Sequence, residues 1–110
     1  MKVELAGEEF ELKLTFERMR AIEKEIGSLY SYPDKCAAKT VTAADIVCIY
    51  YHGQEGTAYN MGTIFTKVME DGLVTHVTRT YDAVMSLVFG EKLMRQIEDE
   101  SKKKLEEDLS

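Results

Sequence analysis

Residues 2–14 read KVELAGEEFELKL and form two short alternating runs around a glycine, Gly7. Every second position of the two runs is apolar: Val3, Leu5, Phe10, Leu12 and Leu14. Period-two alternation around a glycine turn predicts a β-hairpin with one apolar and one charged face. Because a lone two-stranded hairpin is only marginally stable in water, the apolar face needs a covering element.

The segment that follows predicts a helix over residues 16–26. Thr15 is a suitable N-cap, and Gly27 stands where a residue that ends a helix belongs. Apolar residues recur every three or four positions: Phe16, Met19, Ile22 and Ile26. Charged residues fill the other faces, so we expect this apolar stripe to lie on the hairpin.

Residues 28–41 contain the single proline, Pro33, and show no sustained period, which predicts a loop with room for one helical turn. Residues 42–53, TAADIVCIYYHG, are apolar nearly all round and predict the central, most buried helix. Thr42 is its expected N-cap and Gly53 its stop. The β-branched residues in this run leave a strand as the alternative.

Two further helices are predicted in the second half. The first begins after an Asn60 cap and ends at Gly72, and the second begins after a Thr75 cap and ends at Gly90. The first has the apolar stripe Met61, Ile64, Phe65, Val68 and Met69. The second has the apolar face Val77, Tyr81, Val84, Met85 and Val88. Both stripes are expected to face the core.

Residues 91–110, EKLMRQIEDESKKKLEEDLS, combine strong helix formers with few apolar positions. The apolar edge consists of Leu93, Met94, Ile97 and Leu105. This pattern predicts a charged amphipathic helical tail that is exposed, frayed or completed by a partner. The predicted fold is α+β and mainly α: a single globular domain over 1–90, with an N-terminal hairpin and about four helices, and the tail over 91–110.

Composition excludes several classes of function. The chain has 110 residues and a net charge of −6, without the basic stripe of a nucleic-acid-binding protein. It contains no apolar run long enough to span a membrane and no signal peptide at its start. Cys36 and Cys48 do not form a Cys-x-x-Cys motif, and we expect two reduced thiols in an intracellular protein.

The residues that carry chemistry give no pattern of an enzyme. Neither His52 nor His76 has a second ligand at the helical i+3 or i+4 spacing that a metal site uses, so we expect structural roles, no metal site and no cofactor. Cys48 and His52 are four residues apart and can approach each other on one helix. The apolar run around Cys48 nevertheless raises the thiol pKa and disfavours a nucleophile. No catalytic residue is therefore predicted.

Tyrosines are the more informative polar residues. Tyr30, Tyr32, Tyr51 and Tyr59 lie in or beside the two expected loops. Aromatic rings in such places either form protein interfaces or cover the ends of the core.

The order of these parts resembles the tail assembly chaperone family of long-tailed phages, which includes tail proteins of gene transfer agents. The motifs are the glycine hairpin, the helix running from Phe16 through Ile22-Glu23 to Gly27, the stretch DIVCIYYHG, and a helix closing on Gly72-Leu73. They cover residues 2 to about 90. The resemblance implies a non-enzymatic chaperone in the cytoplasm of a bacterial host cell, which binds the tape measure protein or other tail proteins during tail assembly.

Contact residues for such a partner are hypothesised from exposure and apolar character. They are Leu93, Met94, Ile97 and Leu105 of the tail, with the loop tyrosines Tyr30 and Tyr32. A mostly helical partner can be held by helix-in-groove contacts, and a homo-oligomer is the other association considered.

Two rival functions remain open at the level of sequence. One is a small acidic phage or prophage regulatory protein that binds and inhibits a host protein, which requires carboxylates clustered on one face. The other is an enzyme whose site is assembled from distant residues, which requires a deep polar pocket containing Cys48 or a histidine.

Overall fold

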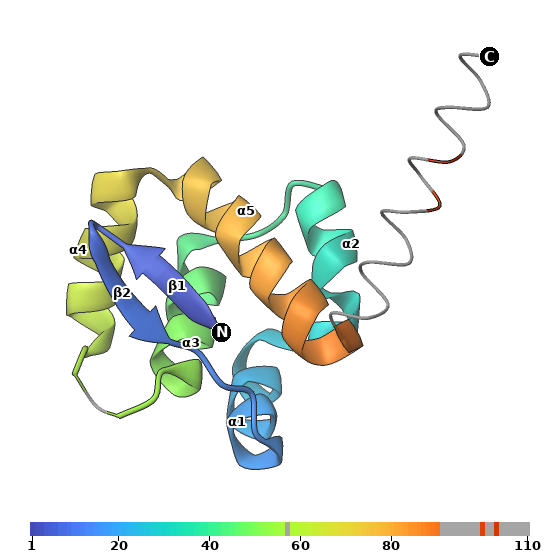
Figure 1. Ribbon diagram of the computed structural model, residues 1–110, viewed down its shortest axis with the longest axis horizontal. Coiled ribbons are helices and arrows are strands. Elements are labelled where there is room, and N and C mark those ends of the chain that lie inside the picture. Colours follow the sequence, from blue (N-terminus) through green and yellow to red (C-terminus); the bar gives the residue numbers. More distant parts are fainter. Residues whose placement is uncertain (57, 91–99, 101–102, 104–110) are drawn as a thin grey trace.

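A β-hairpin at the N-terminus is followed by five α-helices in the part of the chain that the computed structural model describes, residues 1–56, 58–90, 100 and 103 (Figure 1). The elements are β1 (Lys2–Leu5), β2 (Glu8–Glu11), α1 (Phe16–Ile26), the 3₁₀ turn η1 (Leu29–Ser31), α2 (Tyr32–Ala37), α3 (Ala43–Gly53), α4 (Met61–Asp71), α5 (Leu73–Val84) and the π-helical η2 (Met85–Gly90). The predicted α+β, mainly α, fold is confirmed.

The predicted hairpin forms around a two-residue turn, Ala6-Gly7, and Glu8 already belongs to β2. Val3 pairs with Phe10, and Leu5 pairs with Glu8. Ala6 and Gly7 both have positive φ, 51° and 81°, which a two-residue turn needs to match the twist of the strands. Gly7 adopts this backbone freely, whereas Ala6 adopts it at a conformational cost.

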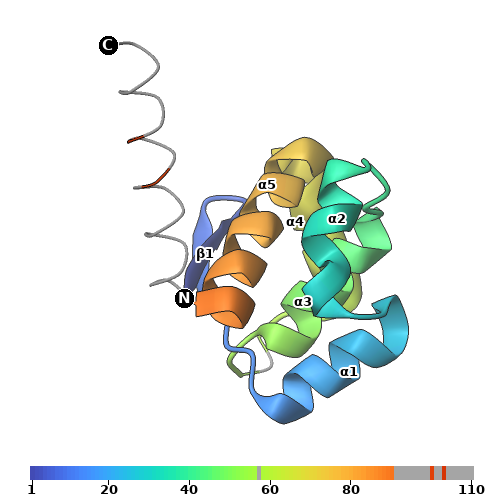
Figure 2. The same ribbon diagram turned by 90° about the vertical axis from the view of Figure 1, so that its right-hand side faces the viewer.

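α1 packs mainly against α3, and the prediction that its apolar stripe lies on the hairpin is wrong. Phe16, the first residue of that stripe, is 79% exposed, and Ile22 is fully buried. The hairpin lies beside α4 and α5 instead, while Figure 2 shows α1 away from β1. The reason is that α3 is apolar on several faces, so the hairpin and α1 pack on different sides of it.

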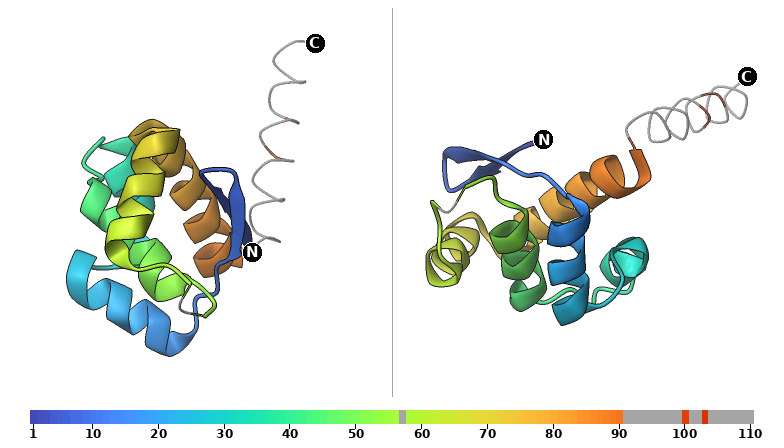
Figure 3. Two further views of the ribbon diagram at one scale, coloured as in Figure 1. Left: turned by 90° about the vertical axis from the view of Figure 1, so that its left-hand side faces the viewer. Right: turned by 90° about the horizontal axis from the view of Figure 1, so that it is seen from below.

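α3 is the central helix, as predicted, and lies between α1 and α4 (Figure 3). Its N-terminus carries a capping box, because the Thr42 side chain accepts from the Asp45 N–H and the Asp45 carboxylate accepts from the Thr42 N–H. Residues 45–50 are all buried. Gly53 is the last helical residue rather than the stop, and Gln54 follows as the C-cap.

Residues 28–41 contain more helix than the predicted loop. Ser28 caps η1 by accepting from the Tyr30 N–H, and Pro33 stands in the first turn of α2. A proline there removes an N–H that has no partner within the helix, so it favours the start of α2. Leu29 and Tyr32 are buried and hold this segment on the core.

α4 has the predicted ends, but α5 does not. Asn60 caps α4 by accepting from the Thr63 N–H, and Gly72, with φ of 95°, separates the two helices. α5 already begins at Leu73, so Thr75 lies inside the helix and is not its cap. The buried residues of α5 are His76, Thr80, Ala83 and Val84, so only Val84 of the predicted face is fully buried.

None of the helices that the structure describes is both long enough and apolar enough to cross a lipid bilayer.

Candidate functional site

The two predicted contact tyrosines lie in different environments. Tyr30 is 71% exposed, and its ring centroid lies 5.0 Å from that of Phe89. Tyr32 is 1% exposed, and its hydroxyl lies 2.6 Å from Thr80 Oγ1, which places it in the core. Burial raises the pKa of Tyr32. The four predicted tail contacts, Leu93, Met94, Ile97 and Leu105, lie outside the described residues.

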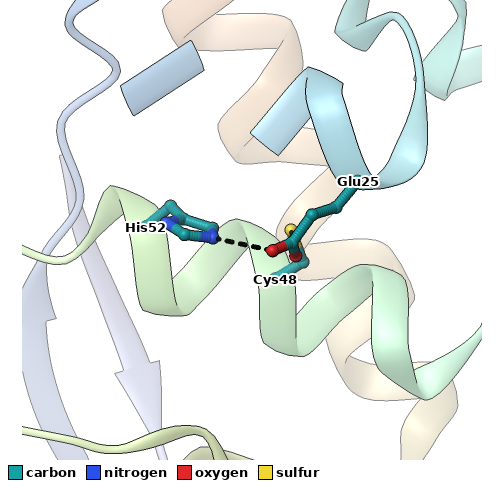
Figure 4. A group of neighbouring side chains, drawn as sticks. All are labelled: Glu25, Cys48 and His52. Carbon is teal, nitrogen blue, oxygen red and sulfur yellow. Dashed lines mark hydrogen bonds and ion pairs between the residues drawn. The ribbon is translucent and has the colours of Figure 1, made fainter. Parts of the chain in front are cut away.

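The described residues bring three chemically different side chains together where α1 meets α3 (Figure 4). The thiol of Cys48 donates to Glu25 Oε2 at 3.0 Å, and His52 Nε2 lies 3.5 Å from Glu25 Oε1. One donor atom from each residue lies within 4.8 Å of the other two. Glu25 therefore stands between the thiol and the imidazole.

Helix geometry explains this convergence. Cys48 and His52 are one turn apart on α3, so their side chains leave the same face of that helix. Glu25 lies in the last turn of α1, which ends at Ile26 and packs against α3. The approach of Cys48 to His52 was visible in their spacing, whereas Glu25 is one of 20 acidic residues and no local pattern singles it out.

The electrostatics of the cluster oppose thiol chemistry. Burial, together with the adjacent Glu25 carboxylate, raises the pKa of Cys48 to about 12, so the thiol stays protonated near neutral pH. The Cys48 hydrogen bond, followed by the nearby His52 imidazole, lowers the pKa of Glu25. His52 Nε2 is buried and makes no hydrogen bond among the described residues. A thiolate nucleophile is thus disfavoured in the cluster as it stands.

A second polar network joins α3, α4 and α5. Asp71 Oδ2 accepts from His76 Nε2 at 2.7 Å, and His76 Nδ1 lies 2.8 Å from the Tyr50 hydroxyl. With Nε2 donating, a neutral imidazole accepts the hydroxyl proton at Nδ1. Tyr50 and His76 are fully buried, and burial raises the pKa of Tyr50. This Tyr-His-Asp arrangement is closed to solvent at its tyrosine end and acts as a structural link.

The surface of α4 carries an apolar face that the sequence assigned to the core. Met61, Phe65 and Met69 are 40%, 47% and 50% exposed, and only Ile64 and Val68 of the predicted stripe are buried. The prediction that the whole stripe faces the core is therefore wrong. We call Met61, Phe65 and Met69 the α4 face. The spacing showed an apolar stripe, but it could not show that α3 covers only part of it.

Two hollows among the described residues are open at the surface. One of about 360 Å³ is lined by Arg18, Tyr51, His52, Gln54, Gly56, Tyr59 and Asn60. Another of about 440 Å³ is mostly apolar and is lined by Cys36, Lys39, Val41, Val74 and Val77. Cys48 lines neither of them, so the thiol and the polar hollow beside His52 are separate features.

No protein-family model, curated protein or solved structure matches the chain. The likeness to tail assembly chaperones therefore rests on the motifs of the sequence.

Proposed function

We propose that this protein is a non-enzymatic tail assembly chaperone that binds the tape measure protein in the cytoplasm of a bacterial host. The observation that carries this proposal is the α4 face, an exposed row of two methionines and a phenylalanine on a folded domain. The sequence resemblance supplies the identity of the partner. The α4 face supplies a surface suited to it.

The α4 face has the dimensions and chemistry of a helix-binding surface. Its members follow one another at intervals of four residues, so the row extends over about 12 Å of α4. Methionine side chains are flexible and polarizable, and they adapt to partners of irregular shape. An amphipathic helix of a partner can bury its own apolar stripe against such a row. This fits a long helical client with many similar segments.

Charge distribution supports a chaperone over a protein that imitates nucleic acid. Several carboxylates in the described residues are paired with cations, in the ion pairs Lys13–Glu55, Lys35–Asp45, Lys67–Glu8 and Arg79–Asp71. A DNA mimic needs unpaired carboxylates gathered on one face. The net charge of −6 instead favours solubility of the complex.

Co-expression with a tape measure protein from the same genome tests the proposal. The triple variant M61S/F65S/M69S is expected to bind that protein about a hundredfold more weakly or worse, since three apolar anchors each contribute about 1 kcal/mol or more. The control is Phe16→Ser, which removes an even more exposed ring from α1 and is expected to leave affinity unchanged. Affinity is measured by calorimetry, together with the solubility of the partner.

A second pair of variants tests the contacts proposed from sequence. A chain ending at Gly90 removes Leu93, Met94, Ile97 and Leu105, and Tyr30→Ser removes the exposed ring of η1. Both are expected to weaken binding, whereas Tyr32 is left intact because it is a core residue. Equal affinity of the native chain and the α4 triple variant would contradict the proposal that the α4 face binds the partner. A source genome without tail genes would contradict the proposed chaperone function. Capture of a host regulator would favour the rival function, a regulatory protein that inhibits a host protein.

A further inference from the structure

The Glu25, Cys48 and His52 cluster contains the three donor types that proteins use to bind zinc. A thiol sulfur, an imidazole nitrogen and a carboxylate oxygen converge from two helices, and each lies within 4.8 Å of the others. The borderline-soft character of Zn²⁺ matches this mixed set of sulfur, nitrogen and oxygen ligands. Magnesium and calcium prefer oxygen ligands alone, so they fit the cluster poorly.

We propose that Glu25, Cys48 and His52 bind a zinc ion with three protein ligands and a water molecule in the fourth position. The inference is independent of the partner-binding function, because none of these residues belongs to the α4 face. It departs from the sequence-based expectation of no metal site, which rested on the absence of a second ligand at i+3 or i+4 from either histidine and did not count Cys48, four residues before His52.

The distances from the Glu25 carboxylate to the other two ligand atoms are close to those of a tetrahedral site. Zinc bonds of about 2.0–2.3 Å place neighbouring ligand atoms about 3.3–3.8 Å apart. In the cluster, Cys48 Sγ and Glu25 Oε2 are 3.0 Å apart, and Glu25 Oε1 and His52 Nε2 are 3.5 Å apart. Glu25 is about half exposed, so its carboxylate has the freedom to open by the small amount that an ion requires. Cys48 and His52 stay one helical turn apart on α3 when the ion binds.

His52 provides the second, independent observation. Its Nε2 atom is buried and has no hydrogen-bond partner among the described residues, although it points toward the Glu25 carboxylate (Figure 4). A buried polar atom without a partner costs free energy, so such atoms call for a specific explanation. Coordination of a zinc ion by Nε2 satisfies this atom, and the neutral imidazole is the form that binds metals.

The charges of the ligands also match those of a zinc ion. On binding, the sulfur–hydrogen bond of Cys48 breaks, the proton leaves to solvent, and a sulfur–zinc bond forms without any change in oxidation state. The thiolate and the Glu25 carboxylate then carry two negative charges, which the Zn²⁺ ion neutralises. The ion removes the energetic cost that otherwise keeps the buried thiol protonated. The bound ion joins the last turn of α1 to the middle of α3.

Cobalt substitution gives a direct readout of sulfur ligation in the intact protein. Titration of the reduced full-length chain with Co²⁺ is expected to produce a thiolate-to-cobalt charge-transfer band that saturates at one equivalent and disappears on addition of Zn²⁺. Cys48→Ser is expected to abolish the band. Cys36→Ser, which changes the only other cysteine, is expected to retain it.

Two variants outside the buried thiol keep the test valid if loss of that thiol disturbs folding. His52→Gln and Glu25→Gln are expected to lower zinc affinity by at least about tenfold, since even second-shell changes cost that much. Glu17→Gln, an exposed change on the same helix as Glu25, is the matched control and is expected to bind zinc as the native chain does. Zinc is also expected to raise the Tm of the native protein and of the Glu17 variant, but not of the His52 variant.

Three results would overturn the proposal: no cobalt band in the native protein, a band that survives Cys48→Ser, or zinc affinity that is unchanged in His52→Gln. Each is distinct from failure of the proposed function, because none of them involves the tape measure protein.

Discussion

Asp71 joins the N-terminal hairpin to α5 through a single carboxylate oxygen. Its Oδ2 atom accepts from the Ala6 N–H at 2.8 Å, from His76 Nε2 at 2.7 Å and from Arg79 at 3.2 Å. The same Arg79 guanidinium donates to the Glu4 carbonyl at 2.8 Å. The hairpin turn is therefore tied to α5 by charged hydrogen bonds, which are the stronger kind.

Replacing Asp71 with asparagine is expected to destabilise the protein by about 2–3 kcal/mol, because the buried imidazole and the Ala6 N–H lose a charged acceptor. Urea unfolding followed by circular dichroism measures this loss. Asp82→Asn, an exposed change on the same helix as His76, is the control and is expected to shift stability by less than about 0.5 kcal/mol. Equal stability of the two variants would show that the link to the hairpin contributes little.

Lowering the pH is expected to weaken the same hydrogen bonds between Asp71, the hairpin turn and α5. The Ala6 N–H, followed by His76, holds the pKa of Asp71 below its usual value. A carboxyl whose folded pKa is depressed contributes stability above the unfolded pKa and loses it as pH falls through the folded value. Unfolding free energy should thus fall from about pH 5 to about pH 3. This loss of unfolding free energy should be smaller in Asp71→Asn. Part of the loss should remain in that variant, because the pKa values of Glu8, Glu11 and Glu25 are also lowered.

None of this network could be predicted from the sequence. The Ala6 donor is 65 residues from Asp71, and the hydrogen bonds exist only because α4, α5 and the hairpin turn meet at one point. His76 was expected to have a structural role, but a histidine in a helical run gives no indication of which acceptor it faces.

Elements are held in place by close backbone contacts as well as by side chains. The segment after β2 runs along the end of α3, where the Lys13 N–H donates to the Gly53 carbonyl at 2.9 Å and Leu12 pairs with Gln54. A Cβ at Gly53 would lie only 2.6 Å from the buried Leu12 side chain. Glycine is therefore required at position 53 for close approach, not for an unusual φ.

Gly53→Ala is expected to destabilise the protein by about 1–3 kcal/mol through overpacking against Leu12. Gly62→Ala is the matched control, because a Cβ there meets no atom closer than 3.5 Å within α4. Alanine favours the helix, so the control should gain up to about 1 kcal/mol. Thermal unfolding of the two variants measures both shifts, and a neutral Gly53→Ala would mean that Leu12 moves aside freely.

Helix boundaries were predictable wherever a capping side chain or a glycine marks them. Thr15, Thr42 and Asn60 each accept from a backbone N–H at the start of a helix, and Gly27 and Gly72 follow the last helical residues. The start of α5 was missed because Gly72, which makes no side-chain cap, precedes it directly. The helix at Tyr32 was missed because it is held by burial and not by a repeating pattern.

At the scale of the whole molecule, the residues that the structure describes share one buried core. Its fully buried members extend from Leu5 to Val84, and residues 87–89 pack against them. A chain ending at Gly90 is expected to keep its unfolding free energy within about 0.5 kcal/mol of the full chain, since it removes no member of that core. Matched urea titrations of the two chains measure the difference, and a loss of several kcal/mol would contradict a 1–90 domain.

The candidate sites were only partly predictable at this scale. The sequence showed that Cys48 and His52 share a helical face, but the crossing of α1 over α3, which adds Glu25, depends on tertiary packing. It also showed the stripe on α4, but the exposure of Phe65 depends on how far α3 extends beside it. Helical periodicity identifies apolar faces, whereas the neighbours that cover them are a property of the whole fold.

The ties from the hairpin to Asp71 and Arg79 set the order in which the protein matures during synthesis. The ribosome adds about 5–20 residues per second, so residues 65 and 75 positions downstream of the hairpin follow it by roughly 3–15 s. Throughout that interval, α5 is not yet available to pack against the apolar side of β1 and β2. A nascent chain that stalls before Arg79 is therefore expected to leave the apolar side of the hairpin partly uncovered, where quality-control proteases can reach it.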